Sequence, residues 1–306
     1  MAKRIALRQR LGAQAFSAGP SGHNSQTMNP CALDPQWLAA LQASAERPPR
    51  RARLPLMLGA HVIGSVEPDF LAPIAGSNSS RVSEVLQRET SIQGPLWRVH
   101  GEGTQALQII AHALRDARVG SVAQQWRHEQ LAVWGPQGEQ LATVERGVVR
   151  PLGIATRAVH LVGCTRAGRY WVQQRALDKA NDPGLWDTLM GGMVSAADTL
   201  TAALARETWE EAGLLLEVLQ GLAQGGRVAM RKPSTNDRAG YVVEQIDWFV
   251  ATLPDGVQPA NGDGEVAQFM LLDKQELVDK LHRHEFTTEA ALILAAALRL
   301  ARSDAQ

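Results

Sequence analysis

The sequence is poor in cysteine and has no long apolar run. Its two cysteines, Cys31 and Cys164, are too few for a disulfide framework or a cysteine-based zinc site. No segment approaches the roughly 18 to 20 apolar residues of a membrane-spanning helix. The 31 basic and 31 acidic residues cancel, so no overall field attracts nucleic acid or a membrane. These absences favour a reducing, cytoplasmic setting without nucleic-acid or membrane partners, and they leave the oligomeric state open.

Acidic residues are missing from the start of the chain. The first is Asp34, and four basic residues precede it: Lys3, Arg4, Arg8 and Arg10. This composition is compatible with an organelle-targeting leader. We instead expect residues 1–30 to be a disordered tail, or an over-long start upstream of Met28, because chain termini are often disordered.

Residues 31–148 predict a small α+β domain without recognisable catalytic chemistry. Asp34 caps a helix in "LDPQWLAALQASAE". The remaining patterns predict a strand pair, a second helix and a hairpin, at residues 56–66, 104–119 and 129–149. In the second helix Leu107, Ile110 and Leu114 share one face.

The pattern changes in residues 149–306. Alternating apolar residues predict strands, which lie at 154–164, 169–176, 241–253 and 269–273. A helix ends at Ala212, before Gly213, and two closing helices cover 274–281 and 288–302. A long loop rich in glycine and proline, "LDKANDPGLWDTLMGGMVS", lies between the early strands and the first helix. This order predicts an α/β fold, an α/β/α sandwich preceded by the small α+β domain.

The helix "RETWEEAGL" carries three glutamates on neighbouring turns. Glu207 and Glu211 continue the apolar stripe that Leu200 and Leu204 begin, and Glu210 lies beside them. Like charges at this spacing repel one another, and the helix dipole favours cations at this end. A partly buried carboxylate pair either raises its pKa or binds a cation such as Mg²⁺ or Mn²⁺. The alternative is a solvated face, paired with Arg206 and Arg175.

The residues around this helix resemble the signature of the Nudix hydrolases. In "GMVSAADTLTAALARETWEEAGL", seven residues stand at the matching positions: Gly192, Arg206, Glu207, Glu210, Glu211, Gly213 and Leu214. Two positions depart from the pattern, since Asp198 replaces a glutamate and Thr208 an apolar residue. Asp198 is expected to cap the helix start.

The resemblance implies a site and a reaction. Nudix enzymes hydrolyse a diphosphate linked to another moiety, so Glu207 and Glu211 would bind Mg²⁺ or Mn²⁺, Glu210 would assist and Arg206 would orient the acidic residues. The general base varies within the family. Glu265 is the first candidate, and Glu244 and Asp247 come next. A surface or turn carboxylate is the plainer interpretation of each.

Outside the signature, the chain is similar to a Nudix subgroup with an N-terminal domain of unknown function, related to the Nudix half of a fungal thiamine pyrophosphokinase. That resemblance implies hydrolysis of thiamine diphosphate, preferentially its oxidised forms, to the monophosphate. Arg175 and Lys179 would then meet phosphate oxygens, Trp186 would stack on the ring and His160 would line the pocket. Alternatively, Trp186 and His160 pack in the core, and Arg175 and Lys179 pair with Asp178 and Asp182.

Three other functions remain as alternatives or are set aside. The first alternative is a hydrolase of the same kind that acts on a nucleoside diphosphate derivative such as ADP-ribose. The isopentenyl diphosphate isomerases share the fold and a similar "RxxxK…PGxW" run, but they need a cysteine near that loop, and "DTLMGG" has none. A Nudix-fold binding module without catalysis is the alternative from another class.

Overall fold

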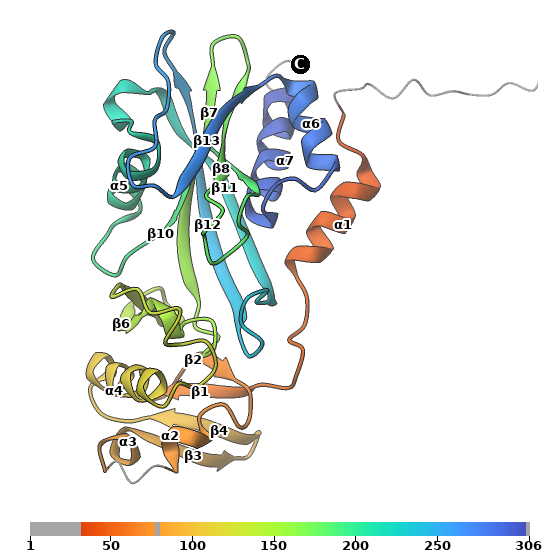
Figure 1. Ribbon diagram of the computed structural model, residues 1–306. Coiled ribbons are helices and arrows are strands. Elements are labelled where there is room, and N and C mark those ends of the chain that lie inside the picture. Colours follow the sequence, from red (N-terminus) through yellow and green to blue (C-terminus); the bar gives the residue numbers. More distant parts are fainter. Residues whose placement is uncertain (1–31, 77–79, 304–306) are drawn as a thin grey trace, which may run out of the picture.

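The computed structural model describes residues 32–76 and 80–303, in two layered units (Figure 1). The helices are α1 (Pro35–Ala45), α2 (Ala72–Ala75), α3 (Ser80–Val85), α4 (Gly103–Asp116), α5 (Leu200–Ala212), α6 (Lys274–His282) and α7 (Thr288–Ser303). The strands are β1 (Leu54–Leu58), β2 (His61–Val66), β3 (Leu86–Ser91), β4 (Gly94–Val99), β5 (Gln130–Trp134), β6 (Gln140–Glu145), β7 (Thr156–Thr165), β8 (Tyr170–Arg175), β9 (Trp186–Asp187), β10 (Met190–Met193), β11 (Gln220–Pro233), β12 (Tyr241–Leu253) and β13 (Val266–Leu272). The predictions for residues 1–30 and for Cys31 fall outside the described residues.

The smaller unit is built on a four-stranded sheet in the order β2-β1-β4-β3. Leu107, Ile110 and Leu114 of α4 are fully buried in its core, which confirms the predicted helix face. The β5–β6 hairpin, also predicted, adds Leu131 and Val144 to the same core. Strands β3 and β4 were not predicted.

The larger unit is a seven-stranded sheet in the order β11-β12-β7-β8-β13, with β10 paired to β7 and β9 to β8. Strands β7 and β12 run parallel, from Thr156 opposite Glu244 to Thr165 opposite Leu253. Helix α5 covers one face of the sheet, and α6 and α7 cover the other (Figure 1). The predicted α/β/α sandwich is confirmed. In residues 32–76 and 80–303, no helix is both long and apolar enough to cross a membrane.

Helix α1 does not pack where the sequence analysis placed it. Asp34 caps it as predicted, accepting a hydrogen bond from Gln36 N at 2.7 Å. However, Trp37 and Leu41 pack against the core beneath α6 and α7, and not against the smaller unit. The edge of the Trp37 ring also meets His282 of α6, with the ring centres 5.1 Å apart. The assignment of this helix to the N-terminal domain was therefore wrong, because its apolar face belongs to the other core.

The boundary between the units also differs from the predicted position at residue 148. Val149, Leu152 and Ile154 are buried in the core of the smaller unit, so that core extends to residue 154. Their turn is fixed there because the backbone of Ser65 on β2 donates to the carbonyl of Leu152 at 2.8 Å. The larger unit begins with β7.

The side chain of Arg53 joins the two units. Its guanidinium donates to Ser65 Oγ at 3.0 Å, to the carbonyl of Pro151 at 2.7 Å and to the carbonyl of Ala239, before β12, at 2.7 Å. Burial lowers the pKa of Arg53, and the negative charges of Glu67 and Asp237 oppose that shift. One side chain thus satisfies carbonyls on both sides of the boundary, which fixes the smaller unit against the larger.

We expect Arg53→Lys to weaken this junction, because an ammonium group on a shorter side chain cannot reproduce the fork of donors and leaves buried carbonyls unpaired. The loss is about 2 kcal/mol, or a melting temperature lower by roughly 4–8 °C. Thermal unfolding followed by circular dichroism measures it, with the exposed Arg88→Lys as control. Equal melting temperatures for the two variants would contradict the role given to Arg53.

Candidate functional site

Helix α5 carries the acidic residues, and its two ends are fixed locally. The Thr199 side chain accepts a hydrogen bond from Ala202 N at 3.1 Å, and Gly213 closes the helix in the left-handed conformation with φ of 64°. Leu204 and Thr208 are buried on the face that packs on the sheet. Thr208 is tolerated in an apolar position because its hydroxyl donates to the carbonyl of Leu204 at 2.6 Å.

The predicted acidic continuation of the buried stripe is present in the structure. Glu211 is only 3% exposed, and the side chain of Glu207 is 13% exposed. Glu210 lies further out, with its side chain 44% exposed, and Trp209 points into solvent. The carboxylates nearest the sheet are therefore removed from water.

Arg206 connects three carboxylates around this helix. It donates to Glu207 at 2.9 Å, to Glu210 at 3.0 Å and to Asp198 at 2.9 Å. The predicted capping role of Asp198 was wrong, because Thr199 is the N-cap and the shorter carboxylate reaches Arg206 instead. The alternative pairing of the glutamates with Arg175 is also not observed, since Arg175 pairs with Asp187 at 3.4 Å.

Glu211 accepts hydrogen bonds from neutral donors, and within residues 32–76 and 80–303 it forms no ion pair, although the charge of Lys179 is near enough to lower its pKa. Its Oε2 accepts from Gln173 Nε2 of β8 at 2.8 Å and from the backbone of Gly191 at 3.1 Å. Burial raises the pKa of Glu211 to about 7, and the nearby charge of Glu207 adds to the rise. Burial also raises the pKa of Glu207, although Arg206 opposes the shift.

Two glycines on β10 allow the side chains to approach the backbone. A Cβ atom on Gly192 would lie 2.0 Å from the carboxyl carbon of Glu207, and one on Gly191 would lie 2.3 Å from Cε1 of His160. Any larger residue at either position would displace the side chain opposite. The glycine of the signature is thus explained by the room that Glu207 needs.

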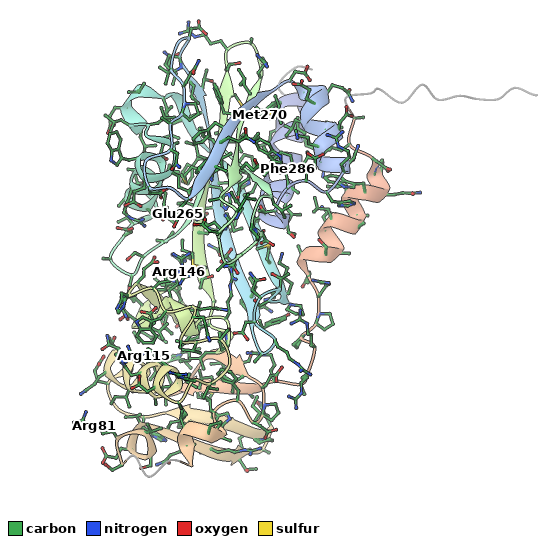
Figure 2. All side chains as sticks on the ribbon, in the orientation of Figure 1. Arg81, Arg115, Arg146, Glu265, Met270 and Phe286 are labelled. Atoms are coloured by element: carbon green, nitrogen blue, oxygen red, sulfur yellow. The ribbon has the colours of Figure 1, made fainter. Side chains whose placement is uncertain are left out.

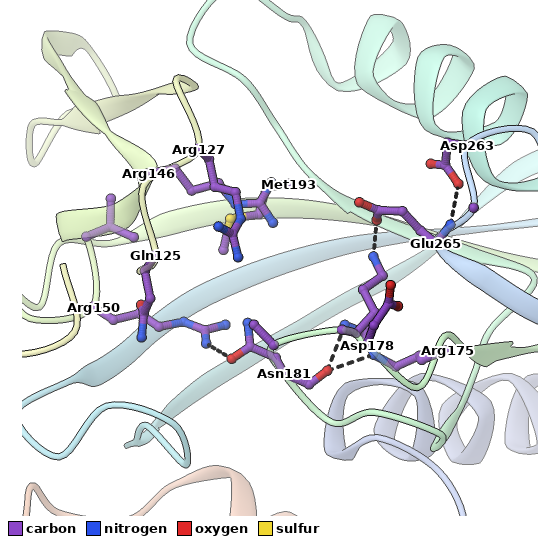
Figure 3. Close-up of a pocket in the computed structure, with 14 residues that line it drawn as sticks. Gln125, Arg127, Arg146, Arg150, Arg175, Asp178, Asn181, Met193, Asp263 and Glu265 are labelled. Carbon is purple, nitrogen blue, oxygen red and sulfur yellow. Dashed lines mark hydrogen bonds and ion pairs between the residues drawn. The ribbon is translucent and has the colours of Figure 1, made fainter. Parts of the chain in front are cut away.

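A cleft of about 410 Å³ lies beside this helix, between the two units (Figure 3). We call it the large cleft; its lining residues include Gln125, Arg127, Arg146, Val149, Arg150, Arg175, Asp178, Lys179, Asn181, Met193, Asp263 and Glu265. Lys179 forms an ion pair with Glu265 in it. Arg175, Lys179 and Glu265, predicted as site residues, are therefore brought together, with partners other than Asp178 and Asp182.

A smaller cleft of about 100 Å³ adjoins the large one. We call it the small cleft; it is lined by Ala158, His160, Asp182, Asp187, Gly191, Gly192, Glu244, Thr287 and Glu289, together with Arg146, Arg150, Arg175, Asn181 and Met193, which it shares with the large cleft. His160 is both buried and part of this lining, and its Nδ1 lies 2.9 Å from Thr188 Oγ1. Glu207 and Glu211 lie just behind Gly191 and Gly192.

Some predicted residues lie away from the clefts. Trp186 is buried in the core with Phe286, under the ammonium of Lys280 at 4.9 Å, so it lines neither cleft. Asp247 is fully buried beside Arg227 at 3.0 Å and is likewise outside both. Glu244 lines the small cleft and accepts from Thr156 Oγ1 at 2.9 Å.

The sequence analysis missed the arginines that residues 31–154 add to the large cleft. Arg127, Arg146 and Arg150 reach this cleft from the smaller unit. The only local signal is the pair in "ERGVVR", where Arg146 and Arg150 stand four residues apart just before β7. Nothing in the sequence around Arg127 links it to the acidic helix.

Comparisons with known proteins give the family. Residues 155–294 match the model of the NUDIX domain. YJR142W, an uncharacterized protein of Saccharomyces cerevisiae, is 26% identical over 185 residues, which are 55% of this chain and 53% of the yeast protein. PA4841, an uncharacterized Nudix hydrolase of Pseudomonas aeruginosa, is 36% identical over 92 residues, 30% of this chain and 54% of its own length.

An isopentenyl-diphosphate Delta-isomerase of Streptomyces coelicolor is 30% identical over 163 residues, 52% of this chain and 79% of the isomerase. The chain spans about half the length of the yeast and Pseudomonas proteins. The matched region begins one residue before β7 and contains helix α5 with its glutamates, Gly192 and the strand that carries His160. Through residues 155–294, this chain belongs to the Nudix superfamily.

Proposed function

We propose that this protein hydrolyses a diphosphate bond in a small organic diphosphate with the help of a divalent metal ion. The observation that carries the proposal is the buried pair Glu207 and Glu211, which lies beside a cleft lined with cations. A diphosphate brings several negative charges, and such a cleft offers it arginine and lysine. Hydrolases of this kind work mainly by positioning and by electrostatic stabilisation.

The acidic residues fit a metal ion that takes only part of its ligands from protein. Among residues 32–76 and 80–303, no group of three or more histidine, cysteine or acidic side chains forms a metal cage. Mg²⁺ and Mn²⁺ do not require one, because they keep several waters and bind substrate phosphates. Glu207 and Glu211 would hold the ion; burial raises the pKa of both carboxyls, so a bound cation would stabilise their ionised form. When bound, such an ion lowers the pKa of water and neutralises phosphate oxygens.

The residues around this pair would position the glutamates, bind phosphate and take a proton from water. Arg206 fixes Glu207 and Glu210 in place, and Gln173 fixes Glu211. Arg175 and Lys179 face the large cleft and would bind phosphate oxygens. Glu265 remains the first candidate for the base that takes a proton from water, because it lines this cleft and is half-exposed.

The small cleft favours a substrate with a cationic part, such as thiamine diphosphate or its oxidised forms. Four carboxylates line it, Asp182, Asp187, Glu244 and Glu289, and they outnumber its three arginines, one of which, Arg175, pairs with Asp187. In the described part of the chain, no aromatic side chain other than the His160 imidazole lines either cleft, so carboxylates and not an indole would hold a thiazolium ring. ADP-ribose is the second candidate, and the charge of the small cleft is less suited to its neutral riboses.

The likeness to an isopentenyl-diphosphate isomerase does not change this proposal. Cys164, on β7 beyond His160, contributes to the core beneath α6 and α7 and lines neither cleft. Burial raises its pKa to about 11, so the thiol stays protonated. The described residues therefore place no reactive cysteine beside the loop that follows β8.

The test of the proposed function is product analysis with purified full-length protein. With Mg²⁺ or Mn²⁺ we expect thiamine diphosphate and its oxo and oxy analogues to yield the monophosphate, more rapidly than ADP-ribose is cleaved. Glu211→Gln should lower the rate by at least about a hundredfold, because it removes half of the metal-holding pair. The exposed Glu217→Gln is the matched control. Tight ligand binding without turnover would instead support a binding module.

Metal-free protein should lose stability as the pH rises. Because the pKa of Glu211 is higher in the folded chain, about 7 against an ordinary value of 4.5, the folded state binds the extra proton between these values. The contribution of this proton to stability is therefore fully present below about pH 4.5 and is lost as the pH rises through about 7, a change of up to about 3 kcal/mol. Thermal unfolding with chelator measures this trend, and added Mg²⁺ should reverse it at pH 8. A melting temperature that falls equally in Glu211→Gln would exclude Glu211 as its source.

Gly192→Ala should separate activity from folding. The added methyl group would collide with the Glu207 carboxylate, which is the mobile end of a side chain, so the strand is kept and the carboxylate moves. We expect turnover to fall about a hundredfold, as for other misplaced catalytic groups, with little change in melting temperature. Gly76→Ala, remote from the clefts, is the control. Full activity in Gly192→Ala would show that the position of Glu207 is not critical.

A further inference from the structure

The smaller unit forms one side of the large cleft. This side, which we call the N-terminal wall, consists of Gln125, Arg127, Arg146, Val149 and Arg150. In Figure 3 the side chains of Arg127 and Arg146 reach into the cleft from one side, while Arg175, Asp178 and Glu265 lie on the other. The wall thus adds three arginines to a site whose acidic helix belongs to a different unit.

Two of these arginines form no ion pair with any residue that the structure describes. The Arg127 guanidinium donates to the carbonyls of Gln124 and Trp126, at 3.4 and 3.2 Å, and Arg150 donates to the side-chain oxygen of Asn181 at 3.0 Å. In the part of the chain that the structure describes, neither has a carboxylate oxygen within 4.0 Å. Arg146, by contrast, pairs with Glu129 at 2.6 Å. Arg127 and Arg150 therefore keep their charge available to a ligand.

The backbone of the wall is fixed in place before any ligand binds. The buried carboxylate of Glu145 accepts from the backbone of Arg127 at 2.8 Å and of Gly147 at 3.2 Å, so it joins both segments of the wall. The hairpin behind it is anchored to the larger unit, because Ala196 N donates to the carbonyl of Gln130 at 2.8 Å and Arg157 stacks on Trp134 at 3.9 Å. A backbone that is already anchored lowers the entropic cost of bringing its arginines onto an anion.

The charges of the two clefts would set the orientation of a bound diphosphate. The small cleft carries four carboxylates beside three arginines, two of which it shares with the wall, whereas the wall residues themselves carry only positive charge. The charge of Arg146 lowers the pKa of Glu207, which places the wall within electrostatic reach of the acidic pair. A diphosphate over that pair would therefore point its free end towards the wall, with its organic part towards the small cleft.

We propose that Arg127 and Arg150 bind the terminal phosphate of the substrate, so that the enzyme selects diphosphates with one free end over diphosphates substituted at both ends. This inference rests on the proposed function and narrows its substrate class. A terminal phosphate carries up to two negative charges, whereas each phosphate of a doubly substituted diphosphate carries one, and arginine binds the former more strongly. Thiamine diphosphate belongs to the first class and ADP-ribose to the second.

Binding and turnover of the full-length protein, with Mg²⁺ present, test this selection. Imidodiphosphate, which resists hydrolysis and has free ends, is titrated by calorimetry into wild type, Arg127→Gln and Arg150→Gln. Each substitution should weaken binding about tenfold, as expected for a lost charge-assisted contact. The value of kcat/KM for thiamine diphosphate should fall by a similar factor, and that for ADP-ribose by less than about twofold.

The controls separate this inference from the function on which it rests. Arg88→Gln, an exposed change on the smaller unit away from the cleft, should leave all values unchanged, and Arg146 is left intact because its loss would orphan Glu129. Unaltered binding in both variants, or equal losses for both substrates, would overturn the selection of a free end. Arginine-dependent binding of imidodiphosphate without hydrolysis of any substrate would refute the proposed function and keep the anion site.

Discussion

The burial of the Glu211 carboxylate is the constraint from which the rest of the site follows. A carboxylate removed from water needs hydrogen bonds, and Glu211 receives them from Gln173 and from the backbone of Gly191. These bonds fix β8 and β10 relative to helix α5. They do not neutralise the charge, so the site remains short of positive charge. Arg206 forms ion pairs with Glu207 and Glu210 but none with Glu211. A divalent ion would supply the positive charge that Glu211 lacks.

Close packing around the glutamates limits what the backbone beside them can be. Gly191 and Gly192 have no side chains, so the β10 backbone packs closely against His160 and Glu207. Gly191 makes room for His160 on one face of the sheet, and Gly192 makes room for Glu207 on the other. His160 then reaches Thr188 on the face of α6 and α7. The acidic side of the sheet and the pocket-lining side are therefore positioned by the same short strand.

Local patterns in the sequence predicted the parts of this structure that depend on local physics. Helix α5, its end at Gly213 and the burial of Glu211 all follow from spacing along one helix. The site residues that were missed depend on contacts across the fold. Arg127 reaches the large cleft because the β5–β6 hairpin that follows it is anchored to Ala196, which lies far along the chain. Trp186 illustrates the opposite error, because an indole that stacks on a ligand and one that packs on Phe286 look alike in sequence.

The docking of helix α1 changes how the chain is organised. The first described helix packs beside α7, the last one, and the backbone after it forms an isolated β-bridge with Arg231 of β11, where Arg47 N donates to the Arg231 carbonyl at 2.7 Å. The smaller unit is therefore an insertion between two parts of one core, and not a separate N-terminal domain. During synthesis, α1 is made long before α6 and α7, so its apolar face has no packing partner until nearly the whole chain has been made. This order gives the core a long-range closing step, which is characteristic of slow folding. It also makes a cut before β7 a poor way to isolate the Nudix domain, since the cut would remove part of its own core.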